Sequence, residues 1–359
     1  MMGQRSQHWS RTCLRAALIL LGSVALVLPA AAQMLLTGAG ATFPAALYAQ
    51  WFTQYAMVDG SVRFDYQAVG SGAGMKRLME QTVAFGASDA PMTEAQMQAA
   101  KGGGILHFPT VMGAVVLIYN LPEGSSGLRL TPQTIAEIFL GKITHWNDPQ
   151  LTALNPSLHL PEQAIIVVHR GDGSGTTEIF TDYLSKVSPE WQQRVGHGAI
   201  VTWPTGITAK RSDGVAELIK HTPGAISYVE LTHAVHTAVP YAWVQNHAGH
   251  FIEPTLASIR AAVTETIADI PNDFRVSLTD AAGPDAYPIA AFTWLLVYKQ
   301  QSNKDQGQKL VNFLWWMMHD GQKEAPALHF APLPEEVVTR EEQALTMMTY
   351  DGQPLFAKK

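Results

Sequence analysis

Short apolar runs alternate with helix-like segments along most of the chain. A helix is expected after Pro44, because Leu47, Trp51 and Tyr55 recur at the spacing of one helix face. Short apolar runs predict strands at residues 35–39, 64–69, 83–88 and 164–169, and longer apolar runs lie at residues 108–121 and 288–299. Strands that alternate with helices are typical of the α/β class. Residues 231–287 have too weak a periodicity for us to predict their elements.

The first 32 residues differ from the rest and have the pattern of a secretory signal. The basic residues of this segment are Arg5, Arg11 and Arg15. An apolar run follows at residues 16–28 and ends in small alanines. This run is too short to span a bilayer, so a retained membrane anchor is the less favoured alternative. We predict that residues 1–32 are a signal peptide, cleaved between Ala32 and Gln33.

Cleavage would change the charge and the cysteine content of the chain. The formal net charge of −6 would become −9, because the segment contains three arginines and no acidic residue. Cys13 is the only cysteine, so the mature chain would have no disulfide, thiolate nucleophile or cysteine metal site. An acidic chain without a basic stripe argues against nucleic acid as a partner. We expect a soluble protein of a Gram-negative periplasm.

Four glycine-rich segments share one pattern. They lie at residues 37–45, 69–76, 85–92 and 170–177, and we call them the anion turns. Each follows a predicted strand, and at least three lead into a helix. A helix N-terminus has unpaired N–H groups and a positive dipole end, and glycine lets a ligand approach the backbone, so such a turn can bind an anion. One such turn is usually only a capped turn, but four beside a single arginine and two aspartates favour a shared oxyanion.

The nucleotide-binding motifs do not match these turns. A Walker loop requires a glycine where Met75 stands, just before Lys76. A dinucleotide fingerprint requires its third glycine where Phe43 stands. We therefore expect a small anion and not a nucleotide.

Long segments of the chain carry a family resemblance. In chain order from residue 36 to 230, they are LTGAGATFPAALYAQW, FGASDAPMT, FPTVMGAVVLIYN, LGKITHWNDPQLTALNP, HRGDGSGTTEIFTDYLSKVSPEW, VTWPTGITAKRSDGVAE and PGAISYVE. The later run DAYPIAAFTWLLVYK also fits. With these segments the mature chain resembles the periplasmic phosphate-binding proteins of high-affinity phosphate ABC transporters.

The resemblance implies a fold, a ligand and a partner. The fold would be a two-lobed α/β binding protein of the Venus-flytrap kind (type II), with two crossovers between the lobes. These would fall near Val111 and before Pro288, so that lobe I is residues 33–110 plus 288–359 and lobe II is residues 111–287. Inorganic phosphate would bind between the lobes without water, metal or another cofactor. ABC permease subunits in the inner membrane would receive it, and we expect a monomer.

The resemblance also implies a ligand set. The phosphate-binding residues would be Thr42, Phe43 (through its backbone N–H), Ser71, Asp89, Arg170, Ser174, Gly175 and Thr176. Asp172 matches the partner that orients Arg170. Gly72 departs from the pattern, because a relative has a second serine there, so no role is expected for it. His169 is also atypical, and we expect it to end a strand and not to touch the ligand.

The chemistry of these residue types agrees with the resemblance. Arg170 is always charged and can bind two oxygens at once. Each hydrogen bond to a charged ligand contributes about 1.5–3 kcal/mol, so a full set could reach about micromolar affinity or better. Asp89 helps only if the ligand brings a proton, since an ionised carboxylate can only accept. Phosphate has that proton and sulfate does not, which could separate them by roughly 10⁴–10⁵. The alternative role for Asp89 is to cap the helix after Pro91.

Rival functions remain open at this point. An enzyme is disfavoured because Gly173 separates Asp172 from Ser174, unlike hydrolase motifs, and no histidine is identifiable as a base. The H-x-x-H pairs are His233 with His236 and His247 with His250, and they lack the acidic context of a zinc site. Asp89 argues against oxyanions that are fully deprotonated. Arsenate, which is protonated much like phosphate, stays open as a ligand. A sensory role that uses the same site also stays open. We favour a binding protein and not an enzyme.

Overall fold

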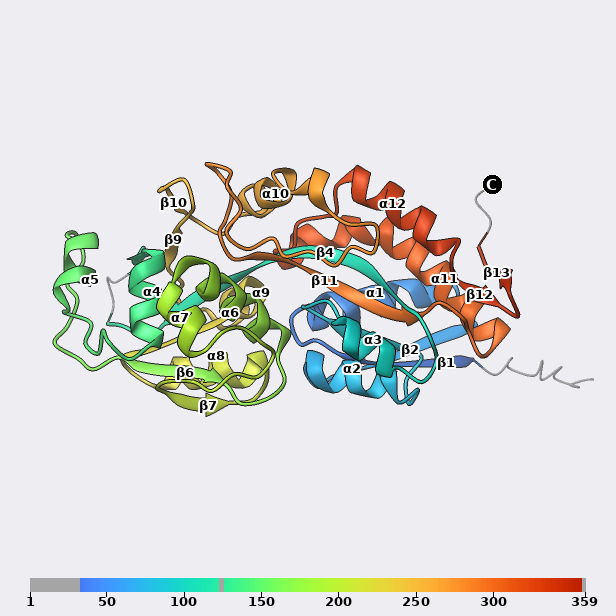
Figure 1. The fold of residues 1–359 in the computed structure, drawn as a ribbon, viewed down its shortest axis with the longest axis horizontal. Helices are drawn as coiled ribbons and strands as arrows, with labels where there is room; N and C mark the ends of the chain where they lie inside the picture. The colour runs from blue at the N-terminus through green and yellow to red at the C-terminus, as the bar shows by residue number, and fades with distance from the viewer. Residues whose placement is uncertain (1–32, 123–125, 357–359) are drawn as a thin grey trace, which may run out of the picture. The chain divides into compact units, whose positions relative to one another are not determined.

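The structure, a computed structural model, describes residues 33–122 and 126–356. The predicted signal peptide, residues 1–32, lies outside the described residues. Strands and helices alternate through the described chain, as the α/β prediction requires (Figure 1). None of the helices in these two ranges has the length and apolar character that a membrane span requires.

One eight-stranded sheet organises the fold, in the order β2-β1-β3-β11-β4-β8-β6-β7. Its strands are β1 (Met34–Gly40), β2 (Val62–Ala68), β3 (Phe85–Ser88), β4 (Ile105–Tyr119), β6 (Ile166–Arg170), β7 (Ile207–Ala209), β8 (Ala225–Glu230) and β11 (Ala290–Tyr298). β1 runs parallel to β2 and β3, and β6 runs parallel to β7 and β8. β11 is antiparallel to β3 and β4, and β4 is antiparallel to β8. The four strands predicted from the short apolar runs are present as β1, β2, β3 and β6, with ends shifted by a few residues, and the two longer apolar runs correspond to β4 and β11.

β4 is shared by the two parallel groups of the sheet. It has 15 residues, nearly all buried, and Figure 1 shows it running beside β11 through the middle of the chain. It pairs with β11 up to Ala114 and with β8 from Val115 onward. Pro109, which has no N–H to donate, lies at a register shift opposite Trp294, where a β-bulge tolerates proline.

The helices pack on the sheet through apolar faces. α1 (Ala45–Val58) begins after Pro44 and buries Leu47, Trp51 and Tyr55, as the spacing predicted. The other helices outside the region 231–287 are α2 (Ser71–Met79), α3 (Glu94–Ala99), α4 (Pro132–Phe139), α5 (Pro149–Leu154), α6 (Gly175–Val187), α7 (Pro189–Arg194), α8 (Arg211–His221), α11 (Lys304–Met318), η2 (Gly321–Leu328) and α12 (Glu335–Leu345). Two small sheets add β5 (Arg129–Leu130) beside β9 (Trp243–Gln245), and β12 (Thr349–Tyr350) with β13 (Gln353–Pro354).

The region 231–287, whose elements the sequence did not predict, contains short elements and a long irregular stretch. The elements are α9 (Leu231–Thr237), β9 (Trp243–Gln245), β10 (Phe251–Ile252), α10 (Leu256–Thr264) and η1 (Ile267–Asp269). No helix or strand of the described chain lies between Asp269 and Ala290.

Residues 273–279, which we call the strap, connect two distant parts of the chain. Arg275 donates a hydrogen bond to the carbonyl of Met92, at 3.2 Å, in the segment that follows β3. Thr279 donates to the carboxylate of Asp182 on α6, at 2.5 Å. The strap therefore holds α6 to the segment after β3 through side-chain contacts.

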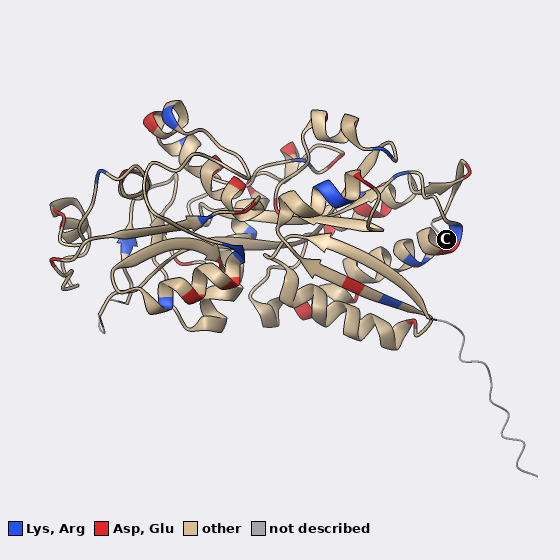
Figure 2. Ribbon diagram, turned by 90° about the horizontal axis from the view of Figure 1, so that it is seen from below, with Lys and Arg blue, Asp and Glu red and all other residues tan. Residues whose placement is uncertain are grey.

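Charged residues are interspersed along the chain. Figure 2 shows Lys and Arg among Asp and Glu over the whole described ribbon, without a concentration of blue on one element.

Candidate anion site

The four anion turns follow the carboxyl ends of four strands. Thr42 and Phe43 follow β1, Ser71 begins α2 directly after β2, and Asp89 follows β3. Because β1, β2 and β3 are parallel, their carboxyl ends meet at one edge of the sheet, where α/β folds bind ligands. The fourth turn follows β6 and leads into α6.

The fourth turn lies directly against the second and third turns, and the second turn packs against the first through the N–H of Gly70, which donates to the carbonyl of Gly40 at 2.8 Å. The N–H of Gly72 donates to the carbonyl of Gly173 at 3.1 Å. A Cβ atom at Gly175 would lie 2.5 Å from Oγ of Ser71 and 2.7 Å from Cβ of Asp89. Turns separated by about a hundred residues in sequence therefore form one site.

Arg170 is the charged group of this site, and Asp172 holds it. Arg170 is 4% exposed. Its Nε and Nη2 atoms donate to the two carboxylate oxygens of Asp172, at 2.8 and 2.6 Å. Burial acts to raise the pKa of Asp172, but the hydrogen bonds and charge of Arg170 outweigh burial and lower it. Nη1 of Arg170 donates to Ser212 Oγ at 3.3 Å, so the guanidinium is fixed in orientation.

Asp89 is an almost fully buried carboxyl group, 2% exposed. Its Oδ1 accepts a hydrogen bond from Thr293 at 2.8 Å, and its Oδ2 accepts from Ser71 at 3.3 Å. Burial raises the pKa of Asp89 to about 7, against the opposing effects of Thr293, Arg170 and Ser71. The group can therefore change its protonation state near neutral pH.

Asp89 does not cap the following helix. α3 is capped by Thr93, whose side chain accepts from the N–H of Gln96 while the Gln96 side chain accepts from the N–H of Thr93. The alternative role of Asp89 as a helix cap is therefore contradicted, and its carboxylate remains directed at Ser71 and Thr293.

The start of α6 supplies donors without partners. Ser174 caps the helix by accepting from the N–H of Thr177 at 3.1 Å. Gly175 and Thr176 are the first residues of the helix, whose N–H groups have no acceptor within it. The hydroxyl of Thr176 is buried and, among the described residues, has no hydrogen-bond partner. A buried hydroxyl of this kind calls for an explanation, and an anion at the helix N-terminus would satisfy it.

The remaining predicted residues also have defined places. The ring of Phe43 packs in the core, 5.7 Å from the ring of Phe330, which leaves its backbone N–H as the group able to face the turns. Thr42 Oγ1 lies 2.9 Å from Ser212 Oγ. His169, within β6, stacks on Trp203 with 4.8 Å between ring centroids, in keeping with a structural role.

Two residues of the site were missed by the sequence reasoning. Ser212, near the N-terminus of α8, contacts both Thr42 and Arg170. Thr293, in β11, contacts Asp89. The available signal for Thr293 was a single polar residue inside the apolar run AAFTWLLVY. Ser212 lies in the segment KRSDG, which carries no comparable signal.

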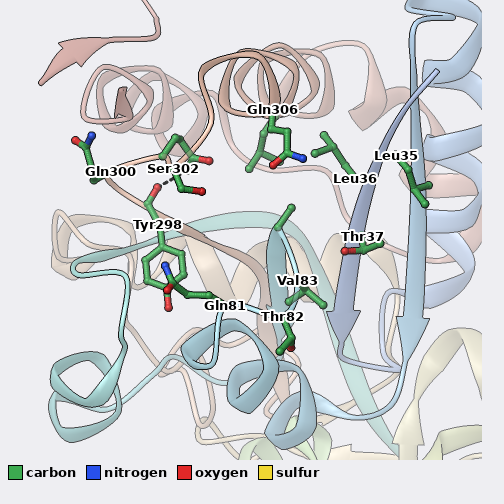
Figure 3. A pocket seen from close by; sticks show the side chains of 13 residues that line it. Leu35, Leu36, Thr37, Gln81, Thr82, Val83, Tyr298, Gln300, Ser302 and Gln306 are labelled. Carbon is green, nitrogen blue, oxygen red and sulfur yellow. Dashed lines mark hydrogen bonds between the residues drawn. The ribbon is translucent and has the colours of Figure 1, made fainter. Parts of the chain in front are cut away.

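The histidine pairs and one cavity contribute no residue to the predicted ligand set. His233 contacts Glu230, and His247 contacts Asp280. In the part of the chain that the structure describes, no three His, Cys, Asp or Glu residues converge in a way that could hold a metal ion. Figure 3 shows a cavity of about 220 Å³ lined by uncharged side chains, among them Gln81 and Tyr298. It has no cationic lining residue, so it does not suit an anion.

Comparisons with known proteins agree with this architecture. The model of the PBP superfamily domain matches residues 27–320. Phosphate-binding protein PstS of Xylella fastidiosa is 41% identical over 304 residues, which are 84% of this chain and 82% of the relative. Phosphate-binding protein PstS of Haemophilus influenzae is 41% identical over 313 residues, 87% of this chain and 92% of the relative.

A solved structure supports the fold. It is that of a high affinity periplasmic phosphate-binding protein (PfluDING) bound with phosphate, with a TM-score of 0.70 and 20% identity, covering 89% of this chain and 96% of that chain. At this identity the match establishes the two-lobed α/β fold. The chain therefore belongs to the PBP superfamily and, within it, to the family of the phosphate-binding proteins PstS.

Proposed function

We propose that this protein captures inorganic phosphate between two lobes and delivers it to an ABC permease for import. The observation that carries the proposal is Asp89, a buried carboxylate able to accept, among the donors around Arg170. The donors favour an oxyanion, and the acceptor favours an oxyanion that still carries a proton. Phosphate meets both conditions at neutral pH, whereas sulfate meets only the first.

The proposed contacts use the residues assembled at the anion turns. They are Thr42, Phe43, Ser71, Asp89, Arg170, Ser174, Gly175 and Thr176, with Asp172 bracing Arg170. The proposed lobes are residues 33–110 plus 288–359 and residues 111–287. This division agrees with the sheet, because β4 and β11 pair where the two groups of strands meet. Closure of the lobes would exclude water from the ion.

The proposal includes a place in the cell and a partner. Cleavage after Ala32 would release a soluble, monomeric chain into the periplasm, where permease subunits of the inner membrane receive the phosphate. The protein would be a binding protein and not an enzyme. In support, Ser174 is engaged as the cap of α6 and does not contact a histidine in the described chain.

Calorimetric titration of the chain from Gln33, freed of phosphate, tests the proposal. We expect one-to-one binding of phosphate at about micromolar Kd or tighter at pH 7, and weaker binding of sulfate, which should weaken further as the pH rises above the pKa of Asp89. Equal binding of both anions would contradict the role of Asp89 but keep the anion site. Binding of neither anion, or steady turnover of a phosphate ester, would overturn the proposed function.

A further inference from the structure

Thr293 is the partner of Asp89 on the side away from the glycine turns. Its side chain is fully buried, and its Oγ1 lies 2.8 Å from Oδ1 of Asp89. The hydroxyl has one hydrogen to donate. Its other acceptor is the carbonyl of Ser88, at a longer 3.4 Å. The shorter contact to the carboxylate therefore takes the hydrogen.

The two oxygens of Asp89 have different surroundings. Oδ1 contacts Thr293 from β11, whereas Oδ2 contacts Ser71 at the start of α2. Ser71 belongs to an anion turn and packs against Gly175 of α6. Oδ2 is thus the oxygen that a ligand at the turns can reach. The hydroxyl of Ser71 can move to a ligand oxygen, but that of Thr293 has no such alternative.

A buried network holds Thr293 in position. Its carbonyl accepts a hydrogen bond from Oγ1 of Thr110 at 3.1 Å. Oγ1 of Thr110 is also 3.0 Å from the hydroxyl of Tyr48, and the carbonyl of Thr110 accepts from Gln322 at 2.9 Å. These contacts link α1, β4, β11 and η2. Because each member is buried and bonded, the network fixes the backbone from which the Thr293 side chain reaches Asp89.

We propose that Thr293 is a selectivity-determining residue of the anion site, which holds Asp89 as an ionised acceptor and so reserves the site for oxyanions that carry a proton. This inference rests on the proposed function. A hydroxyl donor on Oδ1 stabilises the charged form of the carboxylate. An ionised Asp89 accepts the hydrogen of a protonated oxyanion and repels one that has none. A protonated Asp89 would instead donate and would admit both.

Titratable groups on three other elements interact electrostatically with Asp89. Arg170 of β6 favours its ionised form. Tyr48 of α1 and Tyr66 of β2 also face it, and burial raises the pKa of both phenols further above neutrality. Arg170 is therefore the charge that remains when the hydroxyl of Thr293 is removed, and a single substitution isolates the contribution of that hydroxyl.

The test compares Thr293→Val, which keeps the shape but removes the hydroxyl, with Thr293→Ser, which keeps the hydroxyl. Affinities for phosphate and sulfate are measured by calorimetry from pH 5 to pH 9. The valine variant should lose roughly tenfold or more in its preference for phosphate over sulfate at pH 7, since a hydrogen bond to a charged group is worth at least that factor. The pH at which the preference disappears should rise by about one unit. The serine variant should keep the wild-type profile.

A wild-type preference and pH profile in Thr293→Val would overturn the inference. If that variant does not fold, Thr293→Ala is judged by the same criteria. Carbon-13 NMR of the Asp89 carboxyl group gives a second readout that does not require a bound anion. We expect it to titrate at higher pH in the valine variant, and an unchanged titration would refute the role of Thr293. If the wild type binds neither anion, the proposed function fails, while this titration still reports on Thr293 separately.

Discussion

Gly175 has no room for a side chain. A Cβ atom at this position would lie 2.5 Å from Oγ of Ser71 and 2.8 Å from the backbone nitrogen of Asp89. Such distances force one side of the site to move. Because alanine is a good residue for the first turn of α6, the change should prevent closure without unfolding the helix.

We therefore predict that Gly175→Ala weakens phosphate binding by at least about 100-fold while thermal stability changes little, since misplacement on the ångström scale removes several charged hydrogen bonds. Gly214→Ala is the matched control, because that helical glycine of α8 has nothing within 4 Å of an added Cβ. Calorimetry and thermal melts of both variants make the comparison. Equal affinities in the two variants would contradict the close approach at Gly175.

The residues of the site differ in how far the sequence could predict them. Arg170 and Asp89 stand in glycine-rich turns after recognisable strands, so their type and position were informative. Thr293 and Ser212 were missed because their partners are distant in sequence: Asp89 lies 204 residues from Thr293, and Thr42 and Arg170 lie 170 and 42 residues from Ser212. Only the register of β11 and the packing of α8 bring these hydroxyls to the site, and neither follows from a local pattern.

At the scale of elements, the strap is the segment that joins α6 to the chain after Asp89. Arg275 anchors one end through Met92, and Asp182 together with Lys186 of α6 anchors the other through Thr279. Since α6 supplies donors of the anion site and Met92 follows Asp89 closely, any opening between them must strain or break an anchor.

We predict that Asp182→Ala weakens phosphate binding about three- to tenfold, because a lost anchor worth about 1 kcal/mol lets the two sides separate more easily. The effect should appear mainly as a faster release of phosphate in stopped-flow measurements. Glu190→Ala, a change of a partly exposed acid on α7 that pairs with Lys142 and Arg194 and not with the strap, serves as the control. A release rate equal to that of the control would show that the strap does not restrain the site.

α12 contains a buried carboxyl group that forms no hydrogen bond in the described chain. Glu341 is fully buried, and neither carboxyl oxygen has a hydrogen-bond partner in the described chain. Burial raises the pKa of Glu341 well above its ordinary value. A neutral but unbonded carboxyl group still loses the hydrogen bonds that water gave it in the unfolded state.

Replacement of Glu341 by methionine should therefore raise the free energy of unfolding by about 1–3 kcal/mol, because an apolar side chain of similar length has no polar atoms to desolvate. Gln343→Met on the exposed side of the same helix should have almost no effect. Urea unfolding of both variants decides the matter. A loss of stability in Glu341→Met would mean that the carboxyl group has a partner after all.

Helices and strands could be predicted from the sequence where the apolar residues within the element itself have a regular spacing. α1 was predicted from three apolar residues and begins where Pro44 suggested. The strap and its surroundings were not, because their conformation depends on distant groups. Phe274 has a φ of 58°, unusual for a residue other than glycine. Its carbonyl is held by Trp294, and Arg340 lies over its ring.

At the scale of the whole molecule, buried titratable groups make stability depend on pH. The pKa of Asp89 is about 7 in the folded protein against an ordinary value of 3.8. Between these values the folded protein binds the extra proton, so this group makes the protein less stable as pH rises from about 4 to 7. His107 acts in the opposite direction, because burial lowers its pKa from 6.5 to about 4. The measured slope is the sum of such effects.

The difference in the free energy of unfolding between wild type and Asp89→Asn isolates the contribution of Asp89. Without phosphate, the wild type should gain stability relative to the variant as pH falls from 7 to 4, by up to about 4 kcal/mol, from roughly 1.36 kcal/mol per pKa unit. Urea unfolding at several pH values gives this difference directly. Parallel stability curves for the two proteins would mean that Asp89 titrates at its ordinary pKa.

The sharing of β4 between two groups of strands has a consequence for how the chain acquires its structure. Residues 105–119 are synthesised early, but their partners on either side are residues 226–230 and 290–298. Sheets built from such distant segments fold slowly, because long loops must close before the contacts form. The centre of the sheet cannot be completed until residue 298 is available. A ribosome would thus have synthesised most of the chain before the two groups of strands can be joined through β4 and β11.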